Sequence, residues 1–252
     1  MLTAISPYVV GVFQKRNASQ DRWIYATGTP LDFGGVKLLL TAAHVLTDPD
    51  ASVGGQPDDI VFLPPPAAGF LISELTDSAR YAKSRRWDLA RCIGNKALDL
   101  AAILFNTPPP EVQFFALSAD AIPPPSATQV AICGYPFAKS KAIESDDGIR
   151  DLALGDFQCA AVIEPALASG LRWHQLAVDY PSMPGIVNPC GYSGSMVWYD
   201  RARCRTLEEL DGRLSVAAAG VVTDYIGPKR ALYCTKIDMV VEFIKRQVLP
   251  SL

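Results

Sequence analysis

The chain has only two histidines, and one of them, His44, follows an apolar run that ends in Thr41-Ala42-Ala43. The two small alanines allow close backbone packing where a strand turns into a loop. An imidazole in such a place is either a satisfied core side chain or a general base. The segment alone leaves both interpretations open.

A serine stands between glycines in Gly191-Tyr192-Ser193-Gly194, directly before the strand-like run Met196–Tyr199. Flanking glycines permit a tight turn in which backbone N–H groups converge on one point, as a nucleophile beside an oxyanion hole requires. An ordinary β-turn between two strands uses the same residue types. The motif therefore indicates a nucleophile only if a base and an acid elsewhere in the chain accompany it.

Two carboxylates compete as the third member. Asp99 lies at the head of the otherwise apolar run Leu98–Phe105, where an unpaired carboxylate is costly and an imidazole N–H is a natural partner. Asp88 carries the same Asp-Leu-Ala signature, but the apolar run after it breaks off sooner. We favour Asp99, although it could also cap a turn.

The order His44, Asp99, Ser193 separates the classes of hydrolase. An α/β-hydrolase needs a serine first and a histidine last, and here no histidine follows Ser193. A subtilisin-like order could use Asp32, but the alternation of strands and helices that this fold needs is absent. A His-Asp-Ser order on a β-rich chain remains.

Six short blocks in this order resemble the chymotrypsin-like serine proteases, and more closely the bacterial trypsin-like peptidase domains. The blocks span about residues 7–235, and each is weak by itself. They are Ala26–Leu31, Thr41–His44, Asp99–Ala101, Ala131–Pro136, Gly191–Gly194 and Gly220–Thr223.

The resemblance implies an all-β fold of two perpendicular six-stranded antiparallel barrels, with the site in the cleft between them and a C-terminal α-helix. It implies that Ser193 is the nucleophile, His44 the general base and Asp99 the residue that orients the imidazole. The N–H groups of Gly191 and Ser193 would form the oxyanion hole.

The resemblance also places the substrate. Thr223, Asp224 and Tyr225 would pair with an extended peptide. Val187 would form the base of the pocket for the residue before the scissile bond (P1). An apolar base favours a small or medium apolar P1 residue, unless Asp224 turns inward.

Departures from the family pattern favour a second interpretation. Tyr192 replaces the usual Asp or Asn before the serine, so activation by propeptide cleavage is not expected. Ser195 replaces a common Gly and Met196 a common Pro, so we expect a different shape for the turn after the nucleophile. The unusual turn also suits a latent or inactive peptidase-fold module that binds a protein partner.

Two other residues, His174 and Cys190, each have a functional interpretation as well as a structural one. His174 could recognise a P1 Gln or Glu, as a histidine does in viral proteases of this fold, but a strand histidine is the simpler interpretation. Cys190 could form a dyad with His44, but it lacks a Gly-x-Cys-Gly frame. We expect a packed thiol.

The elements that must position these residues are short strands separated by turns rich in Pro, Gly and Asp. The third proline cluster, Pro123–Pro125, divides one peptidase domain, 1–252, into sub-barrels of roughly 1–120 and 126–235. Apolar residues near a 3.6-residue period predict a helix over 236–248. The predicted strands are Tyr8–Phe13, Trp23–Thr29, Val36–Thr41, Ile60–Leu63, Leu98–Phe105, Gln129–Cys133, Phe157–Ile163, Trp173–Asp179, Met196–Tyr199, Ser215–Thr223 and Ala231–Thr235.

Composition limits the partners. A net charge of -3 without a basic run argues against nucleic acid, and no run of about 18 apolar residues predicts a membrane span. Six scattered cysteines and two histidines predict neither zinc nor any other cofactor. No signal peptide is recognisable, so we expect a cytoplasmic protein acting on proteins or peptides, with a regulatory or sensor protein possible in trans.

Overall fold

The computed structural model is described over thirteen segments of the chain. These are residues 5–17, 20–46, 60–63, 81–82, 87–125, 128–134, 141–143, 151–153, 157–163, 170–179, 191–201, 216–227 and 231–252.

The N-terminal half forms an antiparallel sheet in the order β4-β1-β2-β3-β7-β6, with the two-residue β8 (Phe115–Ala116) added in parallel to β2. Strand β2 is long because its first part pairs with β1 and its last part with β3. The strands are β1 (Val10–Asn17), β2 (Gln20–Phe33), β3 (Val36–Thr41), β4 (Ile60–Leu63), β6 (Leu89–Asn95) and β7 (Leu100–Phe105).

The C-terminal half forms a closed antiparallel barrel in the order β12-β13-β16-β15-β14-β9. Closure gives every strand of the barrel a partner on both sides, although β12 and β13 pair only at Val162–Asp179 and Ile163–Val178. The strands are β9 (Gln129–Gly134), β12 (Phe157–Ile163), β13 (Gln175–Asp179), β14 (Met196–Asp200), β15 (Val216–Ile226) and β16 (Ala231–Lys236).

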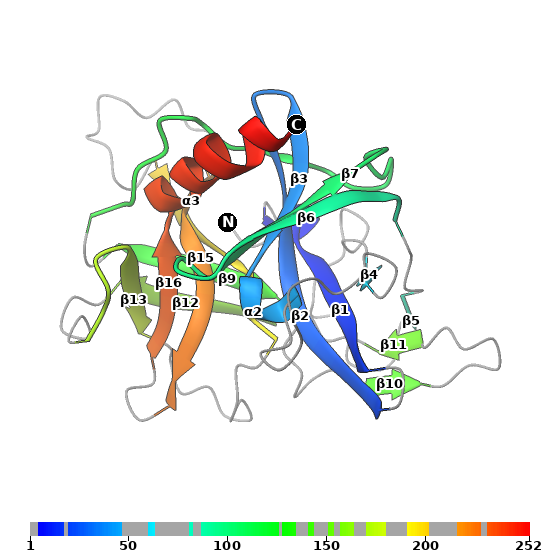
Figure 1. Ribbon diagram of the computed structural model, residues 1–252. Coiled ribbons are helices and arrows are strands. Elements are labelled where there is room, and N and C mark those ends of the chain that lie inside the picture. The colour runs from blue at the N-terminus through cyan, green and yellow to red at the C-terminus, as the bar shows by residue number, and fades with distance from the viewer. Residues whose placement is uncertain are drawn as a thin grey trace.

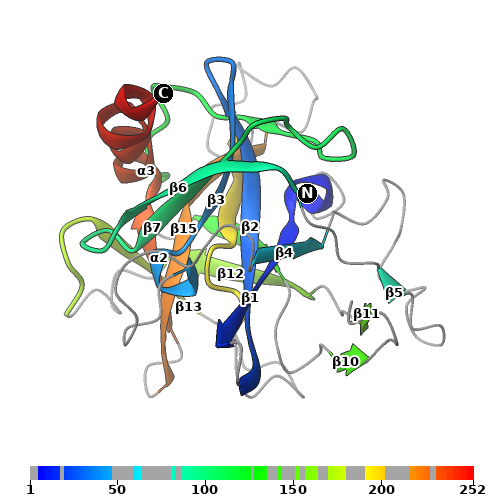
Figure 2. The same ribbon diagram turned by 45° about the vertical axis from the view of Figure 1, so that its right-hand side comes forward.

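A third, small sheet takes strands from both halves. Its order is β10-β11-β5, with β5 at Tyr81–Ala82, β10 at Lys141–Ile143 and β11 at Asp151–Ala153. It lies on the opposite side of the molecule from the C-terminal helix (Figures 1 and 2).

The C-terminal helix α3 (Ile237–Phe243) continues through a π-helical turn at Ile244–Val248 and a 3-10 turn at Leu249–Ser251. This confirms the predicted helix. Its apolar face is fully buried because Val240, Phe243 and Ile244 join one core with Leu31 of β2 and Trp198 of β14. None of the helices in the described segments is long and apolar enough to cross a membrane.

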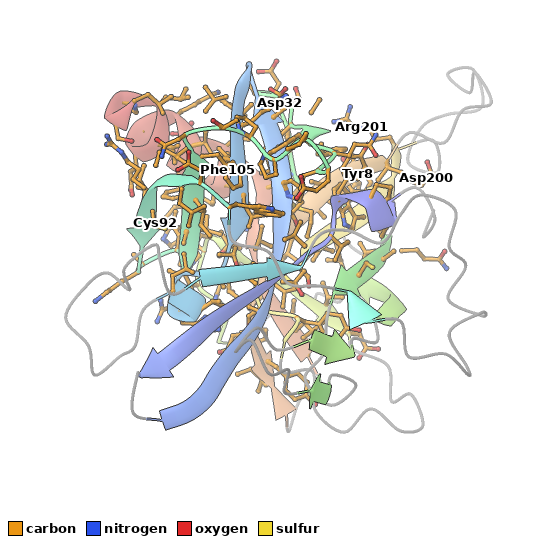
Figure 3. The ribbon with its side chains drawn as sticks, turned by 90° about the vertical axis from the view of Figure 1, so that its right-hand side faces the viewer. Tyr8, Asp32, Cys92, Phe105, Asp200 and Arg201 are labelled. Carbon is orange, nitrogen blue, oxygen red and sulfur yellow. The ribbon has the colours of Figure 1, made fainter. Side chains whose placement is uncertain are left out.

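The same core connects the two halves directly. Tyr8, in the N-terminal turn, contacts the rings of Phe115 and Trp198, and those two rings meet edge to face at 4.8 Å (Figure 3 labels Tyr8). Edge-to-face aromatic pairs add to the free energy gained by burial. The two halves therefore share one apolar core.

The predicted strands differ from the observed ones mainly at their ends. β6 and the short strands β5, β8, β10 and β11 were not predicted, and the run predicted over Leu98–Phe105 becomes a strand only at Leu100. The division of the chain near Pro123–Pro125 falls between β8 and β9, and the two sub-barrels stay a prediction.

Candidate active site

His44 lies on α2 (Ala43–Leu46), a single helical turn directly after β3. Ala42, Ala43, Val45 and Leu46 are buried and fix this turn against β7, while the His44 side chain is 48% exposed. The sequence places one polar ring among four apolar neighbours, so packing turns that ring outward.

Asp99 is held to this turn by three contacts. Its Oδ1 accepts the backbone N–H of His44 at 2.9 Å, its Oδ2 lies 2.7 Å from His44 Nδ1, and its carbonyl accepts the N–H of Ala43 at 3.2 Å. Nδ1 donating to the carboxylate leaves Nε2 as the acceptor. The carboxylate thus fixes both the position and the tautomer of the ring.

The backbone at Asp99 makes this reach possible. Asp99 has φ of 52°, a left-handed conformation that aspartate tolerates better than most residues. The turn before it is fixed by Asn95 Oδ1, which accepts the N–H of Leu98, and by Thr235 of β16, whose hydroxyl donates to the Leu98 carbonyl at 2.7 Å.

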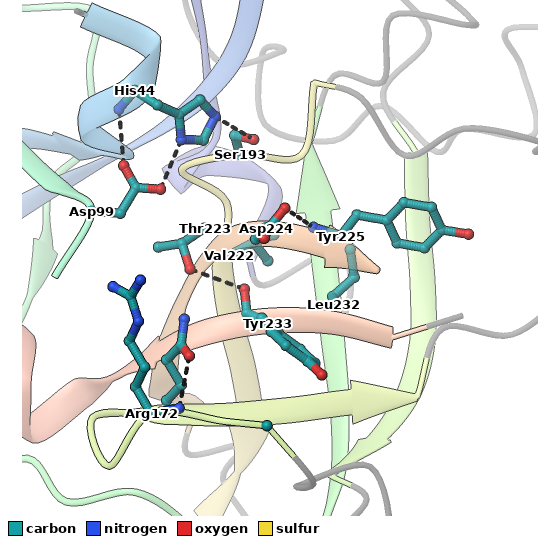
Figure 4. Close-up of a pocket in the computed structure, with 12 residues that line it drawn as sticks. His44, Asp99, Arg172, Ser193, Val222, Thr223, Asp224, Tyr225, Leu232 and Tyr233 are labelled. Atoms are coloured by element: carbon teal, nitrogen blue, oxygen red, sulfur yellow. Dashed lines mark hydrogen bonds and ion pairs between the residues drawn. The ribbon is translucent and has the colours of Figure 1, made fainter. Parts of the chain in front are cut away.

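Ser193 completes the line of contacts. Its Oγ lies 3.1 Å from His44 Nε2, across the gap between the two halves of the chain (Figure 4). The serine sits in a tight loop in which Gly191 and Gly194 have φ of 103° and 87°. Such angles strain any residue with a Cβ, so both glycines are required by the loop itself.

Asp88 and Asp32 lie elsewhere. Asp88 is exposed at the start of β6 and accepts the Asn106 side-chain amide at 2.7 Å. Asp32 accepts the N–H of Gly35 in the β2–β3 turn, well away from α2 (Figure 3). Of the three candidate acids, the structure brings Asp99 alone to His44.

The electrostatic field at His44 favours its charged form. Partial burial lowers the pKa of the imidazole, but the hydrogen bond and charge of Asp99, together with the charge of Asp224, outweigh it. The pKa of His44 is therefore raised above the ordinary value of 6.5. A raised pKa makes the ring a stronger base toward the Ser193 proton.

A cavity of about 680 Å³ opens beside these three residues (Figure 4). Thr223, Asp224 and Tyr225 line it, where the sequence placed them as substrate-binding residues. Gly170, Arg172 and Gln175 also line it, and sequence reasoning missed them because the 170–175 turn carries no recognisable motif. Val187 and Cys190 lie outside the described residues.

Asp224 is turned back on its own backbone. Its Oδ1 accepts the N–H of Tyr225 at 2.7 Å. The neighbouring Thr223 hydroxyl donates to the Tyr233 carbonyl at 3.2 Å. The cavity therefore carries a carboxylate near His44 that is not committed to an ion pair among the described residues.

His174 is not a cavity residue. It is buried directly before β13, and its ring meets Trp173 edge to face at 5.4 Å. Burial, and then the charges of Arg172 and Lys236, lower its pKa. A neutral, packed histidine fits the structural interpretation rather than substrate recognition.

The N–H groups of Gly191 and Ser193 donate none of the hydrogen bonds found among the described residues. No group of three or more metal-ligating side chains occurs within the same segments. The arrangement therefore offers a base and a hydroxyl at one edge of a cavity, and two unbonded backbone donors in the loop that carries the hydroxyl.

Comparison with known proteins shows the fold. No protein-family model matches the chain, and no curated protein matches it either. Among solved structures, it is similar to a serine endoprotease from Yersinia pestis, with 14% identity and a TM-score of 0.56. The match covers 97% of this chain and 65% of that one, so this chain spans about two thirds of its neighbour.

At this identity the likeness carries the fold and no more. Two antiparallel β units with a short C-terminal helix are the chymotrypsin-like double β-barrel, as the sequence predicted. Among the described residues only the second unit closes fully, because no pairing joins β4 to β6.

Proposed function

We propose that this chain is a serine endopeptidase that cleaves peptide bonds through His44, Asp99 and Ser193. The supporting observation is the continuous line of contacts from Asp99 Oδ2 to the imidazole and from the imidazole to Ser193 Oγ, at 2.7 and 3.1 Å. A hydroxyl beside an oriented base is an activated nucleophile.

The reaction follows from these contacts. His44 Nε2 takes the Ser193 proton as Oγ bonds to the scissile carbonyl carbon, and the carbonyl oxygen becomes an oxyanion held by the N–H groups of Gly191 and Ser193. His44 then gives its proton to the leaving amine. A water attacks the acyl-enzyme in the same way, which releases the acid and restores Ser193.

The edge of β15 supports a peptide as the substrate. Pairing of β14 with β15 ends at Met196–Val221, and Val222 then bonds to Gly194 and Ser195. Beyond this point Thr223, Asp224 and Tyr225 face the cavity, where an extended peptide could add as a strand. The proposal includes a small or medium apolar P1 residue, on the sequence argument for Val187.

A fluorophosphonate probe tests the proposal. The native protein is expected to gain one adduct by intact mass, because Ser193 Oγ displaces fluoride from phosphorus, and Ser193→Ala is expected to gain none. The alternative Cys190 nucleophile is tested by Cys190→Ala, which should keep the adduct. No adduct on well-folded native protein would contradict the proposal and favour the partner-binding module instead.

Asp224→Asn is expected to shift the pH profile of kcat/KM. The negative charge of Asp224 contributes to the raised pKa of His44, and the reaction requires neutral His44. Removing that charge lowers this pKa, so activity on the acid side should persist to lower pH. The exposed Asp120→Asn is the control, and an acid limb that moves upward or stays in place in Asp224→Asn would refute the assignment.

A further inference from the structure

Thr27, a residue of β2 in the N-terminal half, holds the loop that carries Ser193. Its side chain is fully buried. Its hydroxyl donates to the Gly191 carbonyl at 2.7 Å, and its backbone N–H donates to the Ser193 carbonyl at 2.9 Å. Its own carbonyl accepts the hydroxyl of Thr41, the last residue of β3, at 2.8 Å.

These contacts fix three consecutive carbonyls of the loop. Those of Gly191 and Ser193 are bound by Thr27, and that of Tyr192 accepts the N–H of Ser195 at 2.8 Å. In a trans peptide the C=O and the next N–H point in opposite directions. Binding the Tyr192 carbonyl on the inner side therefore turns the N–H of Ser193 outward.

The Gly191 arm of the proposed oxyanion hole, meaning its backbone N–H, depends in particular on the Thr27 hydroxyl. That bond fixes the plane of the peptide between Gly191 and Tyr192. The N–H of Gly191 lies in the preceding peptide and is connected to this plane only through the Gly191 Cα. Because Gly191 has φ of 103° and no Cβ, few steric limits hold its backbone, and the bond from Thr27 restrains it on one side. Among the described residues, no other side chain binds the Gly191 carbonyl.

The surroundings of Thr27 leave its hydroxyl little freedom. A Cβ added at Gly134 would lie 2.8 Å from Thr27 Oγ1 and 2.9 Å from the Tyr192 ring. A Cβ added at Gly194 would overlap the Thr27 carbonyl oxygen. Two glycines thus allow the loop and β9 to close around this one threonine.

We propose that Thr27 is a positioning residue whose hydroxyl holds the Gly191 arm of the oxyanion hole in its reactive orientation. This clamp, the pair of bonds from Thr27 to the Gly191 and Ser193 carbonyls, consists of uncharged groups from the N-terminal half. It occurs in a chain that has Tyr192 where the proteases that it resembles carry Asp or Asn before the serine. It rests on the proposed peptidase function, because the arm matters only if an oxyanion forms there.

Thr27→Val and Thr27→Ser test the clamp. Valine has nearly the shape of threonine without the hydroxyl, and serine keeps the hydroxyl. Loss of one oxyanion donor costs about 10²–10³ in kcat, so a loosened arm in Thr27→Val is expected to cost roughly 10–100-fold in kcat. KM should change little, and Thr27→Ser should recover most of the rate.

A purely structural role predicts a different result. In that case Thr27→Val would lower the melting temperature while the folded fraction kept the native kcat, which would overturn the proposal. Thr29→Val, a buried threonine two residues along the same strand, controls for loss of a hydroxyl at this depth.

A second measurement separates the clamp from the proposed function. Amide hydrogen exchange of the peptide that contains residues 191–195 is expected to be faster in Thr27→Val than in Thr27→Ser, at matched global stability. Equal exchange in the two variants overturns the clamp. If native protein takes up no fluorophosphonate, the peptidase proposal fails, and the exchange result alone decides whether Thr27 holds the loop.

Discussion

Asp99→Asn is expected to lower kcat by about 10⁴-fold with little change in stability. Asp99 Oδ2 accepts Nδ1–H of His44, and Oδ1 accepts the His44 backbone N–H. A carboxamide has one oxygen for these two donors, and its NH₂ group favours the tautomer in which Nδ1 accepts. Nε2 would then carry the hydrogen that faces Ser193, and the base would be lost.

Asp88→Asn is the matched control for this substitution. Asp88 accepts the Asn106 amide at the exposed start of β6, away from His44, so its kcat should stay native. Steady-state kinetics on a cleavable peptide, with fluorophosphonate labelling rates as a second readout, compare the two variants. Native kcat in Asp99→Asn, or a loss of equal size in Asp88→Asn, would sink the assignment.

Gly194→Ala is expected to be the most damaging glycine substitution of the loop. A methyl group there overlaps the Thr27 carbonyl and the Thr41 hydroxyl, at a φ of 87° that alanine adopts only with strain. Strain and overpacking each cost about 1–3 kcal/mol. Displacing Ser193 by even 1 Å is expected to cost a further 10²-fold or so in kcat.

Gly94→Ala is the control for this glycine. Gly94 lies in β6, where the nearest atom to an added Cβ, the Leu100 carbonyl oxygen, is 4.0 Å away. Chemical denaturation should show a clear loss of unfolding free energy for Gly194→Ala and little change for Gly94→Ala. Equal stability and equal labelling rates in the two variants would contradict the close packing described around Thr27.

The sequence predicts the candidate site better than it predicts the elements around it. The three reactive residue types stand in one order within locally distinctive blocks, so His44, Asp99 and Ser193 can be selected without a structure. Asp99 is preferred over Asp88 because a longer apolar run follows it. That run forms the buried strand β7.

What the sequence hides are contacts between distant segments. Thr27 and Gly191 are 164 residues apart, and nothing in either segment points to the other. β6 escaped prediction because Arg91, Cys92 and Gly94 break the alternation of a half-buried strand. The strand start at Leu100 was missed because Asp99 has a left-handed backbone, which ends the extended conformation before Leu100. That conformation accompanies a contact with Ala43 of α2, which is distant in sequence.

The shared core bears on how the protein would fail. His44 and Asp99 belong to the first half and Ser193 to the second, with His44 Nε2 3.1 Å from Ser193 Oγ. One apolar core, which includes Phe243 of α3, joins the two halves. Slight loosening of that interior lengthens the contact long before any strand melts. On heating, the rate at which Ser193 reacts with a fluorophosphonate should therefore fall at lower temperatures than the circular dichroism signal of the strands. The reaction rate reports packing between the halves, whereas circular dichroism reports the strands themselves.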